Sequence, residues 1–121
     1  MLHEQRFKRK TTIMNSIKKL QDRIEDTAID VQKIHETLTK KHFRVLTHSF
    51  HCFFYHKYNL GDRPRAEQKD DYNKAIASVV TMKDLLKDLG FTNKELVTID
   101  QKAHDFVWGY LQDKIEKSNA N

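Results

Sequence analysis

The chain has very little proline and glycine: one Pro and three Gly occur among 121 residues. Tight turns between short strands depend on these two residue types, so their scarcity argues against a fold of many short strands. It favours a few long helices joined by short connections. Apolar residues make up 38% of the chain and charged residues 32%, which is polar for a globular protein but sufficient for one core.

Cysteine and long apolar runs are also scarce. The single cysteine, Cys52, excludes an intramolecular disulfide and fits a reducing compartment. No run of 18 apolar residues occurs, so we expect no membrane-spanning helix. Polar residues at positions 3–6 interrupt the N-terminus at once, so we expect no secretory leader. These absences predict a cytoplasmic protein.

The excess of positive charge lies in the first part of the chain. Residues 1–44 carry eleven Lys/Arg against six Asp/Glu, whereas residues 45–121 carry eleven of each. We expect residues 1–11 to form a flexible basic arm, which favours anionic partners or serves only as a solvated tail. Nucleic-acid binding is therefore an alternative function, through Arg6, Lys8, Arg9 and Lys10.

The strongest pattern is a heptad-spaced series of apolar positions. Its steps alternate between four and three residues, which predicts a helix with one apolar face: Ile13, Ile17, Leu20, Ile24, Thr27, Val31, Ile34 and Leu38. We expect this helix to continue to residue 58, with a kink or break near residues 39–42. The flanking residues offer almost no complementary charges for a parallel coiled coil. We therefore favour a wall of an intramolecular bundle over a coiled-coil dimer, while a homodimer stays open.

A turn is expected in the middle of the chain. Gly61 and Pro64 lie in the segment 59–64, where the glycine can end one helix and the proline suits the first turn of the next. We expect the next helix over residues 64–89. Its boundaries follow from this turn and from the glycine that comes after it.

A second turn, at residues 89–95, has the strongest local signals. Gly90 can adopt the left-handed conformation that caps a helix. Thr92 followed three residues later by Glu95 predicts a capping box at the start of the next helix. One short turn therefore ends one helix and begins another, which we expect over residues 93–117.

Together these patterns predict an all-α fold. We expect a three- or four-helix bundle with a long N-terminal helix and a tight C-terminal helical hairpin. The single domain is expected over residues 12–117, between the basic arm and a frayed tail at residues 118–121.

Residues 42–58 are rich in aromatic and histidine side chains. Apolar positions surround this helix, which is typical of a helix central in its bundle or docked to another chain. Because aromatic residues often anchor interfaces, we predict a non-enzymatic protein-binding module of the regulator, inhibitor or immunity type. Its predicted partner-binding residues are Phe43, Phe50, Phe53, Phe54, Tyr55 and Tyr58. The alternative is that this stretch is the core helix and that binding occurs elsewhere.

Three potential metal ligands, His48, Cys52 and His56, are spaced at i, i+4 and i+8. Histidine and cysteine are ligands that zinc prefers. A straight helix separates i and i+8 by about 12 Å, so a site would need further ligands from another helix. We interpret Cys52 as a core residue and expect neither a metal nor another cofactor.

Arg44 and His51 have a loose Arg-x(4–6)-His spacing. This pair resembles the catalytic motif of HEPN-type ribonucleases, which are helical domains of similar size. The resemblance covers these two residues only, and Val45 stands where the family often has a polar residue. It implies RNA cleavage, with the histidine as general acid/base and the arginine on the scissile phosphate. A ribonuclease is therefore a further alternative, although binding without catalysis is the favoured interpretation.

Overall fold

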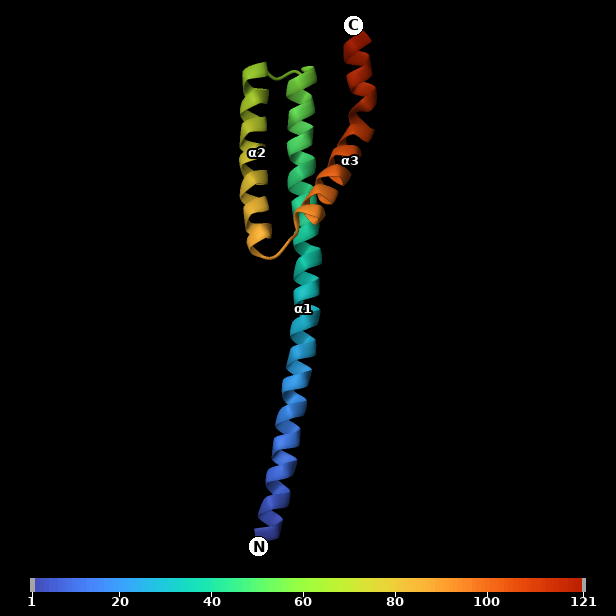
Figure 1. The fold of residues 1–121 in the computed structure, drawn as a ribbon. Helices are drawn as coiled ribbons and strands as arrows, with labels where there is room; N and C mark the ends of the chain where they lie inside the picture. Colours follow the sequence, from blue (N-terminus) through green and yellow to red (C-terminus); the bar gives the residue numbers. More distant parts are fainter. Residues whose placement is uncertain (1, 121) are drawn as a thin grey trace. The chain divides into compact units, whose positions relative to one another are not determined.

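Three α-helices and no strand make up the part of the chain that the structure describes. The computed structural model describes the backbone of residues 2–120 and the side chains of residues 13–27 and 30–119. The helices are α1 (Leu2–Tyr58), α2 (Arg65–Asp88) and α3 (Asn93–Ala120), as Figure 1 shows. The predicted all-α helical bundle with a long N-terminal helix is confirmed.

The chain divides into two units, and the division falls within α1. The first unit is residues 1–37, and the second is residues 38–121. The first unit is one helix, and none of its described side chains is buried. The second unit contains the end of α1 together with α2 and α3. The side chains of the predicted arm, residues 1–11, lie outside the described ones, so its mobility stays a prediction.

Helix α1 passes through residues 39–42 without interruption. The break that we expected there is absent, because no proline or glycine removes a backbone hydrogen bond and the residues present are compatible with a helix. Packing also favours continuation. Leu38 and Thr39 are partly buried, and His42 is fully buried in the second unit.

Three clusters of buried side chains form the core of the second unit. Within this unit, α2 runs alongside the end of α1 in the opposite direction, and α3 crosses α1 (Figure 1). Helix α1 contributes Leu46 and Phe54, and α2 contributes Val79 and Leu86. Helix α3 contributes one apolar face with steps of three and four residues: Leu96, Ile99, Ala103, Val107, Leu111 and Ile115.

The connection between α1 and α2 follows the predicted glycine and proline. Asn59 and Gly61 have φ angles of +49° and +99°, which reverse the chain direction. The Leu60 amide donates to the Tyr55 carbonyl at 2.9 Å. Pro64, with φ of −54°, precedes the first residue of α2. This connection forms one wall of a pocket.

The end of α2 has the predicted glycine cap. The Gly90 amide donates to the Lys87 carbonyl at 3.0 Å, and the Phe91 amide donates to the Leu86 carbonyl at 2.9 Å. This pair of bonds is the Schellman motif. Gly90 has φ of +98°, a conformation that strains residues with a side chain.

The start of α3 has the predicted capping box. The Glu95 amide donates to Thr92 Oγ1 at 3.2 Å, and the Thr92 amide donates to the Glu95 carboxylate at 3.2 Å. Leu86, Phe91 and Leu96 form one buried cluster across the turn. The predicted tight helical hairpin is therefore confirmed.

Candidate functional site

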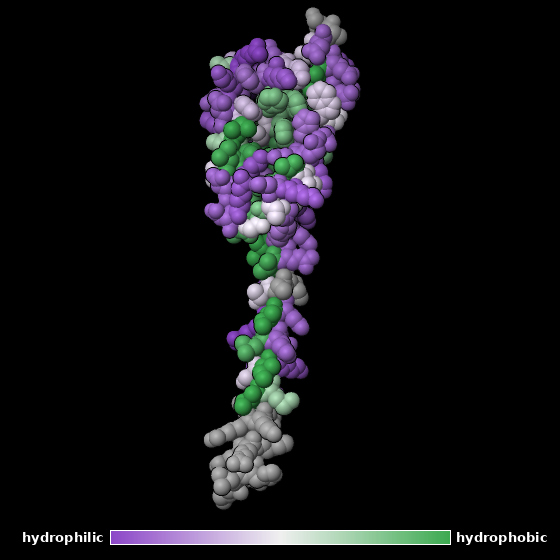
Figure 2. All heavy atoms as spheres, in the orientation of Figure 1, coloured by the Kyte–Doolittle hydropathy of each residue, from purple (hydrophilic) through white to green (hydrophobic). Residues whose placement is uncertain are grey.

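An exposed apolar face runs along the helix of the first unit, visible as the green side chains of that helix in Figure 2. We call it the apolar stripe. It consists of seven large side chains that are 50–69% exposed: Ile13, Met14, Ile17, Leu20, Ile24, Val31 and Ile34. The prediction that the heptad series forms a wall of the bundle is wrong for these positions. Only Leu38, the last member of the series, packs against a core cluster.

Charges of both signs border the apolar stripe. Residues 13–37 carry four Lys/Arg against five Asp/Glu, which gives this segment a net charge of −1. Thr27 is the polar member of the heptad series, and its hydroxyl donates to the Arg23 carbonyl at 2.7 Å. The hydroxyl is therefore satisfied within its own helix, so Thr27 requires no polar partner at an interface.

The predicted aromatic face packs mostly within the second unit. Phe54 is only 3% exposed and belongs to a core cluster. Phe43 packs against a second cluster. The other four aromatic residues pack against the cluster that contains Phe54: Phe50, Phe53, Tyr55 and Tyr58.

Ring contacts join this aromatic stretch to the other two helices. The ring centroids of Phe54 and Trp108 of α3 lie 5.6 Å apart. Those of Phe53 and Tyr72 of α2 lie 5.5 Å apart. Such pairs stabilise a fold by about 0.5–1.5 kcal/mol beyond the burial of their area. These contacts support the alternative that residues 42–58 are a core helix, and their part in partner binding stays a prediction.

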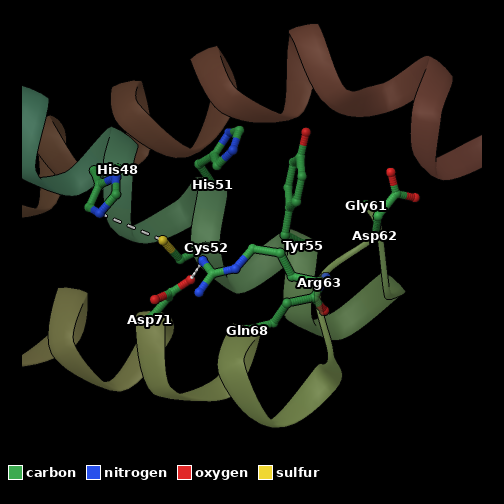
Figure 3. A pocket seen from close by; sticks show the side chains of 9 residues that line it. All are labelled: His48, His51, Cys52, Tyr55, Gly61, Asp62, Arg63, Gln68 and Asp71. Atoms are coloured by element: carbon green, nitrogen blue, oxygen red, sulfur yellow. Dashed lines mark hydrogen bonds and ion pairs between the residues drawn. The ribbon is translucent and has the colours of Figure 1, made fainter.

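A pocket of about 270 Å³ opens between α1, the connection after it and α2 (Figure 3). Its lining residues are His48, His51, Cys52, Tyr55, Gly61, Asp62, Arg63, Gln68 and Asp71. Arg63 pairs with Asp71 and, at 3.3 Å, with Glu67, so its charge is largely neutralised. Gln68 is buried, and its amide oxygen has no hydrogen-bond donor among the described residues.

Cys52 faces this pocket, but its thiol is not activated. Its sulfur lies 3.7 Å from His48 Nε2 (Figure 3). Burial raises the pKa of the Cys52 thiol, and the carboxylate of Asp71 raises it further. The thiol is therefore protonated at neutral pH and is a poor nucleophile. The other predicted ligand, His56, is not part of the lining, and no group of three metal ligands gathers among the described residues.

The two residues that resemble a ribonuclease motif line different hollows. His51 lines the pocket of Figure 3, and its Nδ1 lies 3.0 Å from the Tyr110 hydroxyl. Arg44 lines a separate hollow of about 470 Å³. Burial lowers the pKa of His51, and the charges of His48 and Lys114 lower it further. His51 is therefore neutral at neutral pH, and catalysis by this pair stays a prediction.

Sequence reasoning missed three buried polar residues, Ser49, Gln68 and His42, of which His42 is the most completely buried. Its side chain is 0% exposed, and neither ring nitrogen has a hydrogen-bond partner among the described residues. It lies four residues after Leu38 and four before the buried Leu46, whereas the next step of the heptad series falls on the exposed Lys41, so the series itself does not predict it. Burial lowers the pKa of His42, Asp100 opposes this effect, and Lys83 adds to it.

Comparison with protein-family models, with curated proteins and with solved structures finds no match to the chain. Within the described part of the chain, no helix has the length and apolar character needed to cross a membrane. The predicted nucleic-acid-binding side chains lie outside the described ones, so that function stays a prediction: Arg6, Lys8, Arg9 and Lys10.

Proposed function

We propose that the chain is a non-enzymatic protein-binding module and that the apolar stripe of α1 is its binding surface. One observation carries this proposal: seven large apolar side chains, each at least half exposed, lie along one helix, six of them on one face and Met14 at its border. Single exposed apolar residues are ordinary. A continuous periodic series is different, because monomeric proteins rarely expose large apolar patches, and such patches mark interaction sites.

The spacing of the apolar stripe fits a helical partner. Steps of four and three residues are the pattern by which one helix inserts its side chains between those of another. Burying the exposed part of each of the seven side chains contributes roughly 1 kcal/mol, or about 7 kcal/mol in all before the cost of association. A partner contributes a similar amount from its own apolar face, which is sufficient for specific binding.

The charges beside the apolar stripe favour a protein over a membrane surface or a nucleic acid. A helix that lies on a membrane is typically rich in Lys/Arg on its polar face and often carries Trp or Phe on the other. Residues 13–37 have more acidic than basic side chains and no aromatic residue. Nucleic-acid binding likewise requires an excess of positive charge, which this segment lacks.

A photo-crosslinking amino acid placed on the apolar stripe tests the proposal in cells that make the protein. The test position is Leu20, and the matched control is Asp22, which lies about 200° around the same helix. We expect a crosslinked adduct from position 20 and none from position 22. Adding Ile24→Asp should remove the adduct, because it places a charge in an apolar interface.

A folding control makes this experiment interpretable. Ile24 is 67% exposed, so Ile24→Asp should leave the thermal unfolding of the second unit unchanged. Circular dichroism of the purified variant measures this. Equal labelling from positions 20 and 22, or no adduct from either, would contradict the proposed binding surface.

A further inference from the structure

We propose that the occupant of the apolar stripe is the same stripe on a second copy of the chain, with the two helices antiparallel. This inference rests on the proposed function, because it names the partner of that surface. Over residues 17–34 the two helices are centred midway between Glu25 and Asp26, so that residue i of one copy lies opposite residue 51 − i of the other. The apolar pattern and two charged side chains support this register.

The register pairs every member of the heptad series between residues 17 and 34. The pairs are Ile17 with Ile34, Leu20 with Val31, and Ile24 with Thr27 of the second copy. Because the arrangement has twofold symmetry, each pair occurs twice. Thr27 lies at the centre, where its hydroxyl is already bonded to the Arg23 carbonyl and leaves no unpaired group in the interface.

Two exposed charges select this register over its neighbours. Arg23 and Asp30 directly precede Ile24 and Val31 of the heptad series, and both are exposed. In an antiparallel pair, residues at this position of one helix face residues at the same position of the other. Residues that flank the apolar seam on this side meet two positions away from the directly opposite residue, so in the proposed register Arg23 faces Asp30 of the second copy, twice by symmetry. A shift by one heptad places Arg23 against Arg23, or Asp30 against Asp30 in the other direction. Opposite charges attract and like charges repel, so the central register is favoured.

A parallel pair of these helices lacks the same complementarity. It places Arg23 beside Ala28 and Asp30 beside His35 of the second copy, so the arginine has no acidic partner. This difference in charge pairing favours the antiparallel arrangement.

Sedimentation equilibrium of the full chain tests the assembly. We expect a dimer at micromolar concentration and a monomer for Ile24→Asp. Arg23→Asp should weaken dimerisation by about tenfold, because two attractive pairs become repulsive, and Asp30→Arg should do the same. The double exchange, Arg23→Asp with Asp30→Arg, should recover most of the affinity. It can do so only if these two residues face each other.

A distance between two spin labels tests the orientation. The label is attached to Asn15→Cys, on the polar face of the helix, in a Cys52→Ala background. In the antiparallel register the two labelled positions are 21 residues apart along the axis, about 32 Å at 1.5 Å per residue. With the width of two helices added, we expect a separation of about 38 Å, against about 20 Å for a parallel dimer. If Cys52→Ala weakens the fold, the exchange of Arg23 and Asp30, which keeps Cys52, still tests the antiparallel register.

The outcomes separate this inference from the proposed function. A chain that stays monomeric at micromolar concentration, while the crosslinker at position 20 captures a different protein, overturns the dimer and leaves protein binding intact. A monomeric chain with no adduct overturns both. A dimer with a short label distance, or one whose affinity the double exchange does not recover, overturns the antiparallel register.

Discussion

Replacing His42 with leucine should stabilise the protein. The imidazole is 0% exposed, and neither ring nitrogen has a hydrogen-bond partner among the described residues. A buried polar group without a partner lowers the free energy of unfolding by about 1–3 kcal/mol. Leucine has a similar volume and no polar atom. We therefore expect His42→Leu to raise the free energy of unfolding at pH 7 by about 1 kcal/mol, after allowance for its imperfect fit.

The difference in the free energy of unfolding between His42→Leu and wild type should grow below pH 6.5. Burial lowers the pKa of His42 in the folded state, despite the opposing charge of Asp100, whereas the unfolded chain keeps the ordinary value near 6.5. As the pH falls below 6.5, the unfolded state binds a proton that the folded state resists. Wild-type stability therefore decreases until the pH passes the folded pKa. At pH 5 this loss is at most about 2 kcal/mol.

Urea unfolding, followed by circular dichroism between about pH 5 and pH 8, measures both effects. His51 contributes to the same pH dependence, because burial also lowers its pKa. The free energy of unfolding of His42→Leu should therefore still change with pH, but less steeply than that of the wild type. His48→Gln is the matched control, since that histidine is exposed on the same helix, and it should keep most of the slope. Equal stability and equal slope for His42→Leu and wild type would refute the reasoning.

Three further predictions concern the second unit. Phe54→Ala should lower the free energy of unfolding by about 3–5 kcal/mol in urea, whereas Phe106→Ala, at a 58% exposed position, should cost less than about 1 kcal/mol; equal losses would contradict the described core. Thr92→Ala should cost about 1 kcal/mol in thermal unfolding because it removes the capping box, and an unchanged midpoint would mean that the cap contributes nothing. Cys52 should react with a disulfide reagent at pH 8 much more slowly in the folded chain than in urea, because burial raises the pKa of its thiol; equal rates would show that the thiol is accessible and ionised.

The hairpin between α2 and α3 could be predicted from sequence because its signals are local. Gly90 supplies the left-handed conformation, and Thr92 and Glu95 bond to each other within one helical turn. No distant residue is needed to make these bonds. The structure accordingly contains both the glycine cap and the capping box that the sequence predicts.

The packing of the heptad series could not be predicted in the same way. Its spacing defines an apolar face, and the same face serves a bundle wall or an interface between chains. The lengths of the helices explain why the series is not covered within the chain. Helix α1 has 57 residues, whereas α2 and α3 have 24 and 28, so neither can cover α1 along its full length.

The pocket also lay beyond sequence reasoning. It combines His48 and Cys52 of α1 with Arg63 of the connection and Gln68 and Asp71 of α2 (Figure 3). The sequence pattern placed the two α1 residues four positions apart on one helix, but no local rule brings the other three beside them. Their proximity depends on the antiparallel packing of α2 against α1.

If two apolar stripes associate as proposed, folding of the first unit depends on the concentration of the chain. A helix without tertiary packing is marginal in water, and none of the described side chains in residues 13–27 and 30–37 is buried. In the proposed dimer, association of two stripes is the main source of order for this part of α1, and mass action sets how much of it is formed. Helical signal from the first unit should rise with protein concentration while that of the second unit stays constant. The second unit is then folded at every concentration, whereas the helix of the first unit forms only when enough copies of the chain are present to associate.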